Sequence, residues 1–111
     1  MRRVAANRVY TDRQTYFKNH VVELFDDCVT NHFSLNGEIE MTEWLGGIII
    51  LSRSYSESVF EAKSLDECFE ILENSDNVRK RYYAYHISGI DIQNEIFIAG
   101  RRITLVEENI D

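Results

Sequence analysis

Apolar and polar residues alternate along the first half of the chain in a pattern that predicts β-strands. Residues 20–25 and 28–35 are strand-like runs on either side of Asp26 and Asp27. Aspartate tolerates the backbone angles of tight turns, so the two runs predict a hairpin. In the second run the alternation has a period of two, which is typical of a half-buried strand.

A run of branched apolar residues, from Ile48 to Leu51, follows Gly46 and Gly47. Three β-branched side chains in succession disfavour a helix and suit a strand that is covered on both faces. We therefore expect this strand at the centre of a sheet.

One segment has the signals of a helix. Residues 64–67 read Ser-Leu-Asp-Glu, which fits a capping box, where the Ser hydroxyl and the Glu carboxylate satisfy unpaired backbone N–H groups. The apolar residues here recur at the spacing of one helix face: Leu65, Cys68, Phe69 and Leu72. The pattern predicts a helix over about 64–74, and residues 82–88 and 95–106 return to strand chemistry.

Together these elements predict a single domain over residues 1–111 that is mainly β with one α-helix. The β-rich parts span 1–62 and 82–106, and the helix lies at about 64–74. About six to eight short strands are expected to form a β-sandwich-like or bent antiparallel sheet, with α+β as the alternative class. Proline is absent and glycine occurs only five times, so the pattern indicates no flexible linker.

The composition is that of a folded, acidic protein. Of 111 residues, 44% are hydrophobic and 12% aromatic, and the formal net charge is -7. The amino-terminal residues are not followed by the roughly 7 to 15 apolar residues of a signal peptide. The longest apolar run is also far shorter than the roughly 20 residues that cross a bilayer. These features predict a cytoplasmic protein without a membrane partner.

Catalytic and metal-binding motifs are missing from the sequence. His20, His32 and His86 are isolated, and neither Cys28 nor Cys68 has another metal ligand within two to four residues. Glycine-rich phosphate loops, nucleophile elbows and H-E-x-x-H motifs are also absent. We therefore expect no metal, no cofactor, no enzymatic activity and two free buried thiols. The alternative is a Cys28 nucleophile beside His20 or His32.

Aromatic residues supply the candidate binding residues. Trp44 is the only tryptophan, and Tyr83, Tyr85 and His86 lie in the predicted strand at 82–88. Because Trp and Tyr are favoured interface anchors, these four are the candidate interface or ligand-binding residues. For Trp44, a place that covers the core is favoured over an interface.

Two functions follow from these residues. The first is a noncatalytic domain that acts in self-association, as a homo-oligomer, or in binding a protein partner. The alternative is a small-molecule-binding protein or minor enzyme, with an aromatic pocket lined by the same four residues.

A short basic segment raises a third function. Arg79, Lys80 and Arg81 precede Tyr82, and cations beside aromatic rings are features of nucleic-acid surfaces. The favoured interpretation is a charged loop before a tyrosine-rich strand, because the net charge of -7 repels a polyanion. Nucleic acid is therefore not an expected partner.

Several segments resemble the amino-terminal and closing strands of amidohydrolase-type metal-dependent hydrolases: residues 4–10, 18–24, 42–51, 87–92 and 101–105. The resemblance implies the composite β-sandwich that such enzymes carry beside their catalytic barrel. Where the family continues with a proline-glycine turn and an H-x-H metal pair, this chain reads Ser-Arg-Ser-Tyr at 52–55. The resemblance therefore implies the accessory sandwich without metal ligands or hydrolase activity.

Overall fold

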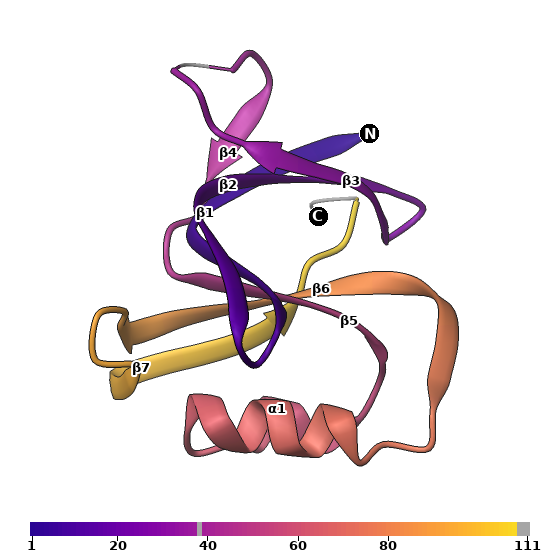
Figure 1. The fold of residues 1–111 in the computed structure, drawn as a ribbon, viewed down its shortest axis with the longest axis vertical. Helices are drawn as coiled ribbons and strands as arrows, with labels where there is room; N and C mark the ends of the chain where they lie inside the picture. The colour runs from indigo at the N-terminus through magenta and orange to yellow at the C-terminus, as the bar shows by residue number, and fades with distance from the viewer. Residues whose placement is uncertain (38, 109–111) are drawn as a thin grey trace.

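Seven strands, one α-helix and one short 3₁₀ helix make up the part of the chain that the computed structural model describes, residues 1–37 and 39–108 (Figure 1). The elements follow in the order β1 (Arg2–Asp12), β2 (Thr15–Phe25), β3 (Cys28–Ser34), β4 (Thr42–Trp44), β5 (Ile48–Ser54), η1 (Glu57–Glu61), α1 (Leu65–Glu73), β6 (Val78–Asp91) and β7 (Ile96–Leu105). The prediction of a mainly β chain with one α-helix is confirmed.

Five of the strands close into a barrel in the order β1-β2-β3-β6-β5 and back to β1. The strand β4 extends the sheet beside β1, and β7 pairs with β6 outside the ring. The predicted sandwich or bent antiparallel sheet is therefore wrong, since β1 pairs in parallel with both β4 and β5. Sandwich and barrel share the same alternation of side chains, so the pattern alone does not distinguish them.

The joint between β1 and β5 is made by the backbone of Gly47. Its carbonyl oxygen accepts hydrogen bonds from the amides of Asn7, at 3.1 Å, and Arg8, at 3.3 Å. The alternation of β1 changes at this joint. Val4 and Ala6 face the barrel interior before it, whereas Val9 does so after it.

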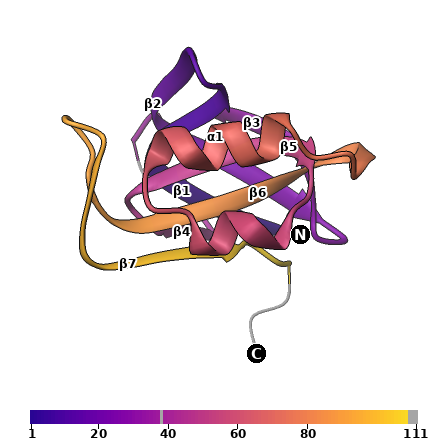
Figure 2. The ribbon, with the colours of Figure 1, turned by 90° about the horizontal axis from the view of Figure 1, so that it is seen from below.

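Two hydrophobic clusters lie on the two sides of the barrel wall. The interior cluster contains Val4, Ala6, Val9, Val22, Leu24, Ile49, Leu51, Ala84 and Val106. The outer cluster includes Tyr10, Ile48, Ile50, Tyr85 and Ile87 and is covered by α1, which lies across β5 and β6 in Figure 2. The four residues Ile48 to Leu51 therefore alternate between two cores, and the prediction of a central strand covered on both faces is confirmed.

Local signals in the sequence predicted the hairpin and the helix correctly. Asp26 and Asp27 connect β2 to β3 with φ angles of 53° and 61°, the two successive positive values of a type I′ turn. The Ser64 hydroxyl accepts a hydrogen bond from the amide of Glu67 at 3.0 Å, and α1 ends at the C-cap Asn74.

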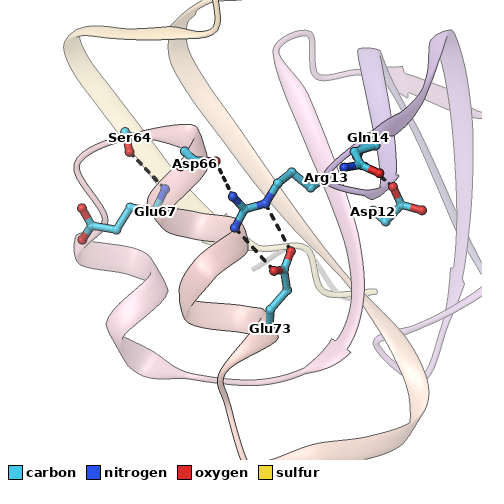
Figure 3. A network of polar contacts seen from close by, with 7 residues as sticks. All are labelled: Asp12, Arg13, Gln14, Ser64, Asp66, Glu67 and Glu73. Atoms are coloured by element: carbon cyan, nitrogen blue, oxygen red, sulfur yellow. Dashed lines mark hydrogen bonds and ion pairs between the residues drawn. The ribbon is translucent and has the colours of Figure 1, made fainter.

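Arg13 connects the β1–β2 turn to α1 (Figure 3). Its guanidinium lies 2.7 Å from a carboxylate oxygen of Asp66 and 3.3 Å from one of Glu73. The Asp12 carboxylate shapes the turn by accepting a hydrogen bond from the Gln14 amide. Because these ion pairs are exposed, they add little stability and mainly hold the turn over the helix.

Three features differ from the sequence prediction. The strand β6 already begins at Val78, so Arg79, Lys80 and Arg81 lie in a strand rather than in a loop. The helix η1 had no counterpart in the prediction. Trp44 is 53% exposed on β4, so the interpretation that it covers the core is wrong. Its strand is only three residues long and lies at the end of the sheet, where little of the protein can cover it.

Replacing Gly47 by alanine is expected to lower the free energy of unfolding by about 3 kcal/mol. Gly47 has a φ of 63°, and a Cβ atom there would overlap the backbone carbonyl of Ile87. Gly100→Ala is the matched control, because Gly100 has a φ of 86° but open space around it. The control should lose only about 1 kcal/mol, the cost of the left-handed conformation. Urea unfolding measures both, and equal losses would contradict the Gly47 joint.

Candidate functional site

The structure places the four predicted site residues in two separate regions. His86 and Trp44 lie near the Gly46-Gly47 turn, where His86 Nε2 is 2.9 Å from the Gly46 carbonyl oxygen and donates to it. Tyr83 and Tyr85 lie on the side of β6 that faces α1. The described residues thus form no single aromatic pocket lined by all four.

The two tyrosines make different contacts. Tyr85 is fully buried, its hydroxyl donates to the Ser54 carbonyl at 2.8 Å, and burial raises its pKa to about 12. Tyr83 is half-buried, and its hydroxyl accepts a hydrogen bond from Arg79 at 3.3 Å. Tyr85 is therefore a core residue and cannot contact a ligand directly.

A hollow of about 350 Å³ opens at one end of the barrel. We call it the barrel mouth, and it is lined by Thr11, Val29, Thr30, Asn31, His32, Leu51 and Tyr82. These residues come from β1, β3, β5 and β6, four of the five barrel strands. The mouths of β-barrels are frequent sites of ligand binding.

The mouth exists because the barrel strands separate at this end. The parallel pairing of β1 with β5 stops at Tyr10 and Ile50, one residue before Thr11 and Leu51. Across the ring, β3 and β6 meet at a single pair, Val29 with Tyr82. Thr11, Leu51 and Tyr82 therefore line an opening.

Two histidines make a pair beside the mouth. His20 on β2 and His32 on β3 approach to 2.8 Å between Nε2 of His20 and Nδ1 of His32. Phe17 stacks on the His20 ring with a centroid distance of 4.7 Å. His20 is only 3% exposed, and its Nδ1 has no partner among the described residues.

The buried nitrogen decides which histidine donates. If His32 Nδ1 donated the proton, His20 would keep a buried Nδ1–H without an acceptor, and buried unpaired N–H groups are rare. We therefore assign the proton to His20 Nε2, which leaves only a lone pair at Nδ1. His32 then carries its proton on Nε2, and this N–H is the donor that it offers to the mouth.

The neighbouring side chains add polar groups without a fixed charge. The Asn31 side-chain oxygen accepts from the His32 amide at 2.9 Å, so its NH₂ group is available to a ligand. The Thr30 hydroxyl donates to the Glu23 carbonyl at 3.3 Å and keeps lone pairs for accepting. Tyr82 is 47% exposed and offers an aromatic face. The lining of the mouth could thus accommodate a neutral, flat ring that carries carbonyl acceptors.

Thiol and metal chemistry are separate from the mouth. Cys28 and Cys68 are free and buried, as predicted, and burial raises the pKa of the Cys68 thiol to about 12. Among the described residues, no hydrogen bond joins Cys28 to either histidine of the pair. Within residues 1–37 and 39–108, no group of three or more His, Cys, Asp or Glu is arranged to hold a metal ion.

The histidine pair is not apparent from the spacing of His20 and His32 along the chain. The signal was in the predicted hairpin, where His20 and His32 flank the same two-residue turn. Val22 pairs with His32 across the strands, which makes His20 and His32 diagonal neighbours on the inner face.

The chain matches no protein-family model, no curated protein and no solved structure. In the part of the chain that the structure describes, no helix is long and apolar enough to cross a membrane.

The tautomers of the histidine pair can be measured directly. In ¹⁵N spectra of the histidine rings at neutral pH, His20 and His32 should both be protonated at Nε2 and unprotonated at Nδ1. Resolved hydrogen-bond coupling between the two rings should connect His20 Nε2–H to His32 Nδ1. A His20 protonated at Nδ1 would contradict the assignment.

Acid should destabilise the protein through its buried histidines. Burial, and then the neighbouring His32, lowers the pKa of His20 below its usual 6.5. The unfolded chain therefore binds more protons just below pH 6.5, so stability is complete above this pH and decreases as the pH falls. Burial also lowers the pKa of His86, which contributes to the same decrease.

Urea unfolding at pH 7.5 and pH 5 tests this dependence. His20→Leu should show a smaller loss of stability between the two pH values than the wild type. His86→Leu should remove a different part of the loss. An unchanged loss in His20→Leu would show that His20 is not the buried titrating group.

Proposed function

We propose that this protein binds a small molecule through a neutral planar ring that occupies the barrel mouth. One observation carries the proposal: a hollow lined by four strands contains His32, whose ring is held in place by the buried His20. A positioned donor in a concave site is typical of ligand recognition. The volume of about 350 Å³ is at the lower end of ligand pockets and favours a ligand with one ring system.

The chemistry of the lining supports recognition through hydrogen bonds and stacking. His32 Nε2–H and the Asn31 amide are donors for ring carbonyl groups, and Tyr82 offers a face for stacking. Second-layer contacts fix these donors, because His20 bonds to the His32 ring and the Asn31 oxygen bonds to the His32 amide. A site whose donors are already oriented loses less entropy when it binds.

Uridine is a suitable first probe, since its base is a neutral planar ring with two carbonyl groups. Binding should shift the amide signals of the mouth residues in ¹H–¹⁵N spectra in a saturable way. Tyr82→Ala should weaken binding about tenfold through the loss of stacking. Phe25→Ala is the matched control, because Phe25 is 52% exposed at the β2–β3 turn and does not line the mouth. Equal weakening by both variants, or no saturable shift, would contradict the proposal.

Self-association is a second candidate, and one observation favours it. Trp44 is 53% exposed and Met41 is 85% exposed, and among the described residues no strand pairs with the outer side of β4. A free strand edge beside large apolar side chains invites pairing with a second copy of the chain. The cytoplasmic location predicted from the sequence is part of both proposals.

Light scattering over a dilution series tests the second candidate. If β4 forms an interface, the wild type should be dimeric at high concentration, and Trp44→Ser should raise the dimer dissociation constant at least tenfold. Phe25→Ser is the control, an exposed aromatic residue on β2 away from β4. A wild type that is monomeric at all concentrations would exclude this function.

A further inference from the structure

Four basic side chains gather at one corner of the barrel mouth. Ser52 pairs with Tyr83 and Ser54 pairs with Val78, so Arg53 on β5 lies opposite the segment 79–82 of β6. We call Arg53, Arg79, Lys80 and Arg81 the basic corner, and all four are exposed. The corner borders the mouth directly, because Tyr82 follows Arg81 and Leu51 precedes Arg53 by two residues.

The cations of the basic corner have no acidic partner among the described residues. The ion pairs within the described residues all involve the terminal amino group or an arginine of residues 2–13. Arg79 packs instead over the rings of Tyr55, at 5.0 Å, and Tyr83, at 5.2 Å. In a chain of net charge -7, these cations make a local excess of positive charge, which attracts an anion.

The strand alternation directs two of these cations toward the mouth. Ile49 and Leu51 face the barrel interior, so Arg53 lies on the same face of β5. On β6, Ala84 faces the interior and Tyr82 lines the mouth, which places Lys80 on their face. The neutral mouth and the basic corner are thus parts of one surface.

We infer that the ligand of the barrel mouth carries a phosphate group, which binds the basic corner while its planar ring occupies the mouth. This inference rests on the proposed function and names the class of ligand: a ring such as a nucleobase joined to a phosphate. Arginine and lysine hold phosphate through charge-assisted hydrogen bonds, and the stacking face of Tyr82 lies between the cations and the hollow. A free nucleotide and a nucleotide unit of a single strand share this chemistry.

Binding of three probes to the full chain tests the inference: uridine, uridine 5′-monophosphate and inorganic phosphate. The monophosphate should bind at least tenfold more tightly than uridine, and raising the salt concentration should reduce that advantage. Arg53→Gln and Lys80→Gln should each weaken binding of the monophosphate about fivefold and leave uridine binding unchanged. Arg102→Gln, at an exposed cation on β7, is the control and should change neither.

The outcomes separate this inference from the proposed function. If uridine and its monophosphate bind equally, the phosphate site is wrong and the ring site stands. If neither binds, both are wrong. A uridine tetranucleotide identifies the source of the phosphate when the inference holds: affinity equal to that of the monophosphate indicates a free nucleotide, and affinity that rises with length indicates a single strand.

Discussion

The closure of the barrel depends on the Gly47 carbonyl group, which accepts the amides of Asn7 and Arg8 and so joins β5 to β1. Only glycine fits this position, because its φ is 63° and a side chain would overlap the Ile87 carbonyl. The pairing of β1 with β5 begins at this joint and lasts for three residues. Without it, the sheet would have two open edges and the interior cluster would lose one wall.

The change of alternation at this joint also decides which side chains reach the mouth. Beyond it, Tyr10 lies in the outer cluster under α1, while Val9 faces inward and Thr11 reaches the mouth. The Tyr10 hydroxyl donates to a carboxylate oxygen of Glu95 at 2.6 Å and so ties the β6–β7 turn to the barrel wall. One backbone irregularity therefore positions both the helix side and the open end of the barrel.

Local sequence patterns were sufficient to predict the helix and several strands, but not the closure of the strands into a barrel. Rules that act within a few residues account for the Asp26-Asp27 turn, the Ser64 cap and the strand that begins at Ile48. The parallel pairing of Arg8 with Ile48 spans forty residues through backbone hydrogen bonds, which leave no trace in side-chain periodicity. The site was missed for the same reason, because the approach of His20 to His32 depends on strand register rather than on spacing.

The central claim is that the barrel mouth recognises a ring through a donor on His32, held by the buried His20. The most direct measurement follows the His32 Nε2–H signal while uridine is added, with the His86 ring as an internal reference because it bonds to the Gly46 carbonyl away from the mouth. The account predicts a saturable shift of the His32 signal with His86 unchanged. A His32 signal that stays constant, or that moves only together with His86, would contradict it.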